Sequence, residues 1–167
     1  MRASHVLAIA GILATAACSK ESNATAAPAT ATPNATVAAS NAPQQEFPWG
    51  PAPAVFPPGA EMAVLEGDPS KAEPFTVRLR FPNGYRIQPH THPTTENVTV
   101  LTGTFLAGMG IQFDESTMQA LGRDGFASVP ANHAHYAMAR GVTVVQVHAI
   151  GPFALTYVNP ADNPVQR

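Results

Sequence analysis

The sequence predicts an all-β domain, a sandwich or barrel of short strands, behind a disordered N-terminal tether. Charged residues make up only 12% of the chain, against roughly 25% in an average domain, while the chain holds 17 prolines and 12 glycines. This composition suits short strands and turns better than helices. From residue 46 onward, short apolar stretches recur between Gly, Pro and Asn residues, and one of them alternates strictly between apolar and polar side chains. That spacing is typical of a sandwich or barrel.

Length, charge and cysteine content limit the functions that the chain can have. Its 167 residues suffice for one ordinary domain and a tail. The formal net charge is -2 and lysine and arginine form no cluster, so we expect no nucleic-acid partner. A single cysteine excludes an intramolecular disulfide and a zinc-thiolate site. Any metal must therefore be held by nitrogen and oxygen atoms.

The segment 1–17 has the features of a secretory signal peptide. Arg2 follows the start, and the apolar run that ends at Ala17 is too short to span a bilayer. Thr15-Ala-Ala-Cys18 resembles a bacterial lipobox, in which the cysteine is lipidated and becomes the mature N-terminus. Thr15 stands where leucine is usual, so cleavage after an Ala-x-Ala site is the alternative. We expect export to the periplasm or cell envelope, with a lipid on Cys18 as the only membrane contact.

Residues 18–45 are predicted to form a disordered linker. The segment consists mainly of Ala, Thr, Asn, Ser and Pro, and Val37 is its only sizeable apolar side chain. It shows neither the 3.6-residue nor the 2-residue period. Such a stretch buries too little surface to offset the entropy lost on ordering.

The domain is expected to span residues 46–167, where large apolar side chains begin. In the stretch 75–81, Phe75, Val77, Leu79 and Phe81 should point inward and Thr76, Arg78 and Arg80 outward, as in a half-buried strand. Only 114–121 looks helical, with Asp114 as its cap. Further strands are expected at 98–102, 104–107, 126–129 and 143–148, separated by Gly103, Gly108, Gly122, Pro130 and Gly141.

Two histidines and a glutamate form a candidate metal site. On a strand, His90 and His92 point to the same face because they are two residues apart. Pro93 cannot donate to a strand ladder, so the chain turns there, and Glu96 can return a carboxylate toward the two imidazoles. This ligand set suits one divalent ion of iron, manganese, nickel, copper or zinc, and it does not choose among them.

The same residues match a known motif. Gly84-x5-His90-x-His92-x3-Glu96-x6-Gly103 resembles the first motif of the cupins at every defined position. The resemblance covers roughly residues 74–160. It implies a double-stranded β-helix, a conical, jelly-roll-like antiparallel barrel with a metal ion near its open end. Some cupins bind sugars without metal, but those usually lack one or more of the ligands.

A second stretch resembles the second cupin motif more loosely. Pro130-Ala-Asn-His-Ala-His135 follows the pattern Pro-x-Gly-x-x-His, which ends in the fourth metal ligand, so the resemblance implies that role for His135. Asn132 stands where glycine is usual, Asp124 replaces the opening glycine, and Ala139 replaces a final asparagine. None of the three is a ligand position, and asparagine also visits positive φ.

Other polar side chains are secondary candidates. His133 could be a fifth ligand or an acid–base group, although its loop position favours exposure to solvent. Arg86 and Gln88 lie on the His90 face by the period-two rule, and Arg86 would suit a substrate carboxylate. His148 either lines the barrel or is a satisfied core histidine. Two tyrosines complete this set of candidates, namely Tyr136 and Tyr157.

The leading functional hypothesis is a metal-dependent oxidoreductase of the dioxygenase type, acting on a small organic substrate. The N3O ligand set usually leaves a coordination position open, as catalysis requires. Two alternatives stay open, because a fold does not choose a reaction. One is a non-enzymatic metal- or small-ligand-binding protein of the cell envelope, and the other is a metal-dependent isomerase or lyase. The resemblance also allows a homodimer of barrels paired edge to edge.

Overall fold

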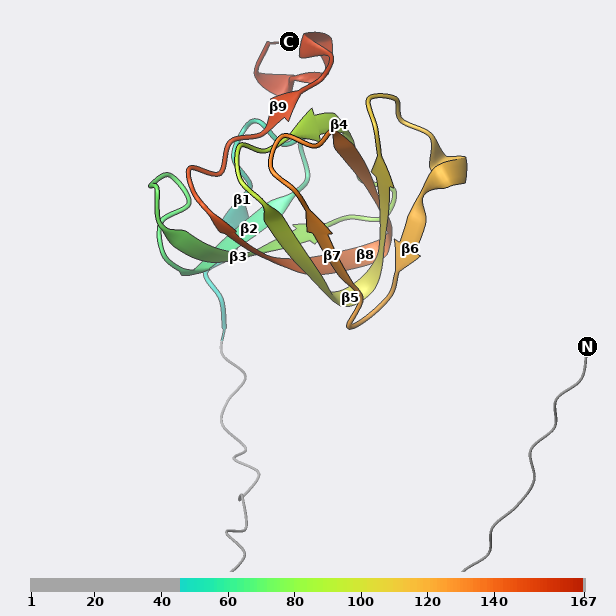
Figure 1. Cartoon of the computed structure of the whole chain (residues 1–167). Helices are drawn as coiled ribbons and strands as arrows, with labels where there is room; N and C mark the ends of the chain where they lie inside the picture. The colour runs from blue at the N-terminus through green and yellow to red at the C-terminus, as the bar shows by residue number, and fades with distance from the viewer. Residues whose placement is uncertain (1–45, 167) are drawn as a thin grey trace, which may run out of the picture. The chain divides into compact units, whose positions relative to one another are not determined.

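Nine strands form the regular structure between residues 46 and 166, the part of the chain that the computed structural model describes (Figure 1). The predicted all-β class is confirmed, whereas the predicted signal peptide 1–17, the predicted lipidation site Cys18 and the predicted linker 18–45 lie outside the described residues. Within residues 46–166, no helix is long and apolar enough to cross a membrane. The strands are β1 (Gly50–Pro51), β2 (Glu61–Glu66), β3 (Pro74–Phe81), β4 (Arg86–Thr91), β5 (Glu96–Met109), β6 (Gln119–Leu121), β7 (Phe126–Val129), β8 (His135–Ile150) and β9 (Thr156–Tyr157), with short 3-10 turns η1 (Glu115–Thr117), η2 (Pro160–Asp162) and η3 (Pro164–Gln166).

The long strands β5 and β8 organise the barrel. They run antiparallel from the pair Glu96↔Ala149 to the pair Met109↔His135. The last half of β8 also pairs with β3, and its first half pairs with β4. The other edge of β5 pairs with β7 and β6. Each long strand therefore pairs with different strands along its two halves, which is the arrangement of a double-stranded β-helix.

These two strands are longer than the sequence predicts. Gly103, Gly108 and Gly141 were expected to separate strands, but β5 and β8 continue through them. The register shifts on both sides of Thr102 show where β5 bends instead of ending. Gly103 adopts a φ of +76° there, and a Cβ on it would lie 2.5 Å from both Thr143 Oγ1 and the Val142 carbonyl oxygen. The glycine thus marks an irregular bend within a paired strand.

The predicted helix at 114–121 is wrong. Asp114 does cap a turn, since its Oδ1 accepts from the Ser116 backbone N–H at 2.9 Å, but only the 3-10 turn η1 follows. Residues 119–121 instead form β6 on the edge of β5, with Ala120 opposite Leu106. None of the residues of η1 is buried, so a helix here would gain no packing energy. Strand pairing therefore decides the structure of this segment.

The alternation predicted for β3 is confirmed on its inner side. Phe75, Val77, Leu79 and Phe81 are at most 3% exposed and form part of the core. The outer side is more covered than expected, because Phe47 and Trp49 lie over it. Their rings stack on the guanidinium groups of Arg78 and Arg80 at 4.2 and 4.4 Å. Thr76 is also buried, and its Oγ1 is 3.0 Å from His148 Nδ1.

We predict that Gly103→Ala destabilises the barrel by about 2 kcal/mol, because alanine is strained at this φ and its methyl group overlaps β8. Gly122→Ala is the matched control, since a Cβ at Gly122 meets nothing within 4 Å. Urea denaturation of both variants measures the difference. Equal midpoints for the two variants would show that the bend does not require glycine.

Candidate metal centre

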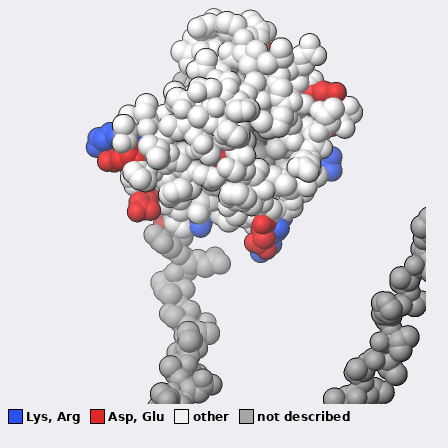
Figure 2. Space-filling model, in the orientation of Figure 1, with Lys and Arg blue, Asp and Glu red and all other residues white. Residues whose placement is uncertain are grey.

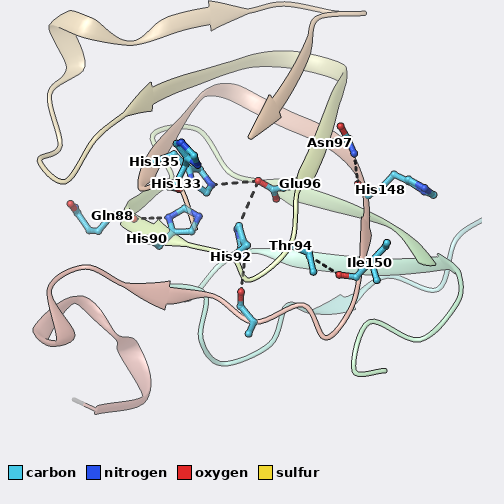
Figure 3. A network of polar contacts seen from close by, with 11 residues as sticks. Gln88, His90, His92, Thr94, Glu96, Asn97, His133, His135, His148 and Ile150 are labelled. Carbon is cyan, nitrogen blue, oxygen red and sulfur yellow. Dashed lines mark hydrogen bonds and ion pairs between the residues drawn. The ribbon is translucent and has the colours of Figure 1, made fainter. Parts of the chain in front are cut away.

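Three histidines converge where β4 ends and β8 begins (Figure 3). His90 lies in β4 opposite His135, the first residue of β8, and His92 follows β4 directly. All three side chains are buried, and one nitrogen of each lies within 4.8 Å of the others. The expectation that His90 and His92 face one point is therefore met, and the loosely matched His135 joins them. Three buried imidazoles in this arrangement can hold a metal ion.

The orientation of each ring is set by a backbone carbonyl group. The Nδ1 atoms of His90, His92 and His135 lie 2.7, 2.8 and 3.0 Å from the carbonyl oxygens of Gln88, Ala154 and His133, respectively. A carbonyl only accepts, so each Nδ1 carries a proton, and in the neutral form of each ring the lone pair is then on Nε2. Histidine ligands of metals are commonly held in this way.

One of these lone pairs has no partner. The Nε2 atom of His135 is buried and makes no hydrogen bond within the described part of the chain. Leaving a buried polar atom unsatisfied costs about 1–3 kcal/mol. A cation at the point where the three Nε2 atoms converge would remove this cost. The residues present therefore fit a metal ion.

Glu96 lies beside the three rings and extends the site. Its Oε2 atom is 3.4 Å from His135 Nε2 and 3.8 Å from His92 Nε2, as the dashed lines in Figure 3 show. Burial by itself would raise the pKa of the Glu96 carboxyl, but the adjacent His135 and His92 rings outweigh burial, and the net shift is downward. Glu96 is thus an ionised carboxylate at neutral pH, in reach of the ion that the histidines would bind.

Burial also keeps two of the imidazoles neutral. It lowers the pKa of His90 to about 3, with help from the neighbouring His135 and His92 rings. Burial lowers the pKa of His92 as well, against the opposing effect of Glu96. A neutral imidazole offers its Nε2 lone pair without first losing a proton. The site is therefore ready for a cation at pH 7.

A small apolar cavity surrounds these side chains. Its volume is about 40 Å³, enough for an ion and a few water-sized groups, whereas sites for drug-sized ligands measure roughly 300–1,000 Å³. Met109 lines the cavity and is 56% exposed, so the cavity meets solvent at this residue, which we call its mouth. Besides the histidines, Glu96 and Tyr136, the described lining residues have apolar side chains or are glycine.

Tyr136 lines the cavity, but its hydroxyl is engaged elsewhere. The hydroxyl donates to the Asp114 carbonyl at 3.3 Å and shares a hydrogen bond of 2.8 Å with Thr117 Oγ1. The ring lies directly against Gly108, where any Cβ would come within 2.2 Å of it. Tyr136 therefore ties the η1 loop to the barrel next to the cavity.

The other secondary candidates point away from the site. Arg86 is exposed and forms an ion pair with Glu115, so the period-two expectation for Arg86 and Gln88 is wrong. The reason is a register irregularity between Ile87 and His90, which turns Ile87 inward in their place. His133 is exposed, and so is His148, which lies on the outer face. Tyr157 is buried, its ring centroid lies 6.2 Å from that of His90, and its hydroxyl donates to the Val55 carbonyl.

Sequence reasoning missed the support that the segment after β8 gives to His92. Phe153 stacks on the His92 ring at 4.9 Å with an interplanar angle of 14°, and the Ala154 carbonyl accepts from its Nδ1. These contacts span more than sixty positions of the sequence. No local pattern could have indicated them.

The loop of the second motif tolerates its unusual residues. Asn132 and Asp124, which stand where glycine is usual, are the non-glycine residues of positive φ in the described chain, at 62° and 64°. Both residue types adopt this region at modest cost. The Asn132 N–H also donates to the His92 carbonyl at 2.8 Å, which joins the loop of one motif to the other.

Comparisons with solved structures agree with the fold. The polyketide cyclase RemF from Streptomyces resistomycificus is 14% identical over 71% of this chain and 86% of that chain, with a TM-score of 0.57. A candidate acetylacetone dioxygenase from Methylibium petroleiphilum is 20% identical over 71% and 79%, with a TM-score of 0.55. An RmlC-like cupin from Shewanella frigidimarina is 17% identical over 55% and 76%, with a TM-score of 0.47.

No protein-family model and no curated protein sequence matches the chain. Similarity at such low identity shows the fold alone. The described part of the chain has the cupin fold that the first motif predicts.

We predict that His135→Ala weakens binding of a divalent transition metal by about 100-fold or more, because it removes one of three converging nitrogens. His133→Ala is the matched control, since this side chain is exposed two positions away and should leave the affinity unchanged. Metal content after dialysis measures the effect, and circular dichroism verifies folding. Full metal content in a folded His135→Ala protein would contradict the site.

Proposed function

We propose that the protein is an exported, metal-dependent oxidoreductase of the dioxygenase type that acts on a small organic substrate. The observation that carries this proposal is the set of three buried histidines, whose Nε2 atoms converge beside the Glu96 carboxylate. His90, His92, His135 and Glu96 would hold one divalent ion of iron, manganese, nickel, copper or zinc. Such an ion supplies Lewis acidity and, where it is redox-active, electron exchange with dioxygen.

The residues of the chain perform the remaining tasks. The carbonyls of Gln88, Ala154 and His133 hold the imidazoles in one orientation, so the ligands need little rearrangement. The apolar walls of the cavity limit the water around the reacting groups, which suppresses side reactions. At the mouth, Met109 offers an apolar surface to the part of the substrate that stays outside.

The cavity favours an oxidoreductase over the two alternatives, a non-enzymatic binding protein and a metal-dependent isomerase or lyase. A shallow, solvent-exposed site would suit a binding protein, but the candidate ligands here are buried among apolar side chains. An isomerase or lyase needs a side chain that moves protons. Among the described lining residues, the Tyr136 hydroxyl is bonded to the η1 loop, and Glu96 already contacts the candidate ligands. An oxidation, for which a redox-active ion held by these residues would supply the electron exchange, makes the smallest demand on such groups.

Oxygen uptake tests the proposed reaction. We expect the metal-replete protein to consume dioxygen together with an enolisable diketone or a flavonoid, and His92→Ala to reduce uptake to background, because it removes a ligand. An oxygen electrode and chromatography of the substrate measure this. Arg86→Gln is the control with unchanged turnover, since Arg86 pairs with Glu115 outside the cavity. Failure of the metal-replete protein to consume oxygen with any such substrate would refute the dioxygenase assignment.

Export and lipidation form the second part of the proposal. We expect the full chain, produced in a Gram-negative bacterium, to incorporate radioactive palmitate and to fractionate with membranes. Cys18→Ala should lose the label and move to the soluble fraction, because Cys18 is the only cysteine. Thr15→Leu, which restores the usual lipobox residue, is the matched control and should keep the label. An unlabelled wild-type protein in the soluble periplasmic fraction would refute lipidation and leave export intact.

A further inference from the structure

We infer that the cavity selects ligands with a single negative charge at their metal-binding end and rejects doubly charged ligands of the same shape. The inference rests on the proposed function, since it concerns the substrate of the same metal site. It follows from the charged and polar side chains that line the cavity.

Glu96 is the only carboxylate among the described residues that line the cavity, and no lysine or arginine lines it. The basic side chains nearest in sequence to the candidate ligands do not line the cavity: Arg86 pairs with Glu115, and Arg140 is exposed. In Figure 2, the charged side chains of the visible face lie mostly toward its periphery, around a broad uncharged surface. Among the described residues, no lysine or arginine is therefore placed to neutralise an additional negative charge near the histidines.

The charge balance then decides which ligands fit. A divalent ion together with the Glu96 carboxylate leaves one positive charge among neutral imidazoles. A ligand with one negative charge makes the site neutral. A ligand with two leaves one negative charge next to apolar side chains such as Val98, Phe105 and Val129, where burial of an unpaired charge is unfavourable.

The cavity also lacks hydrogen-bond donors that could stabilise a second charge. The Nδ1 protons of the three histidines are donated to carbonyl oxygens, and the Tyr136 hydroxyl donates to Asp114. The remaining described side chains of the lining are apolar. A substrate of this site is thus a small molecule with one anionic, metal-binding end and an apolar body, such as the enolate of a 1,3-dicarbonyl compound.

Acetylacetone and malonate form a matched pair of probes. Both can chelate through two oxygens three carbons apart, but each terminal methyl group of acetylacetone is a charged oxygen in malonate. As its enolate, acetylacetone carries one negative charge, whereas malonate carries two. Nickel-loaded full-length protein gives a binding measurement without depending on turnover. Calorimetry yields the dissociation constant of each ligand from the nickel-loaded protein. Each constant is divided by the dissociation constant of the same ligand from free aqueous nickel, which removes the intrinsic chelation strength.

Position 109 allows a positive charge to be added at the mouth of the cavity without burying that charge. Met109 lines the cavity, is the β5 partner of His135 in β8, and is 56% exposed, so a lysine there can keep its ammonium group in solvent at the mouth. Met109→Gln is the control of similar length and no charge. Both substitutions leave the candidate metal ligands in place, and nickel content is measured for each protein before the titrations.

In the wild type, we expect the affinity for acetylacetone, expressed relative to that of aqueous nickel, to exceed the relative affinity for malonate by about tenfold or more. Met109→Lys should narrow this preference by about fivefold, and Met109→Gln should leave it unchanged. Nickel-loaded wild-type protein that binds malonate as tightly as acetylacetone, or neither, would overturn the inference while the proposed function stands. A wild type that takes up no nickel or other divalent transition metal would overturn both.

Discussion

The site depends on the bend that the paired strands β5 and β8 share. Glu96 begins β5 and is paired with the end of β8, whereas His135 begins β8 and is paired with the end of β5. In a straight strand of 14 residues these ends would be about 45 Å apart. In the barrel, Glu96 Oε2 lies 3.4 Å from His135 Nε2. The curvature at Gly103 and its neighbours therefore brings opposite ends of one ladder to a single point.

Around that point, the two nitrogens of each imidazole have different roles: one fixes the orientation of the ring, and the other is available to a metal ion. Backbone carbonyls engage one nitrogen of each imidazole, so the other nitrogen is free for an ion. Burial keeps the His90 and His92 rings neutral, whereas the adjacent His135 and His92 side chains outweigh burial at Glu96 and hold its pKa down, so that Glu96 stays ionised. The same apolar surroundings restrict the charge that a ligand can bring. The proposed metal binding and the proposed ligand preference thus rest on one property, the burial of the candidate ligands among apolar side chains.

Local sequence patterns correctly predicted those elements whose structure follows from a single local cause, such as burial of one face of a strand. The alternation in β3 follows from burial of one face, and the spacing of His90 and His92 follows from the geometry of a strand. Prediction failed where pairing between distant segments competes with local preference. Residues 119–121 pair with β5 rather than continuing a helix, and Arg86 turns outward because the register shifts within β4. Gly103, which was expected to separate two strands, lies instead at a bend within β5.

The sequence by itself determined the all-β class and the types of ligand in the candidate metal site, because strand periodicity and donor chemistry are local properties. It also indicated His135, through the resemblance of its stretch to a second motif. Only the tertiary structure decided that Glu96 meets His135, that Phe153 and Ala154 support His92, and that no lysine or arginine is among the described residues lining the cavity. These relations join residues far apart in the chain, and they exist only because the curved barrel brings its strand ends together.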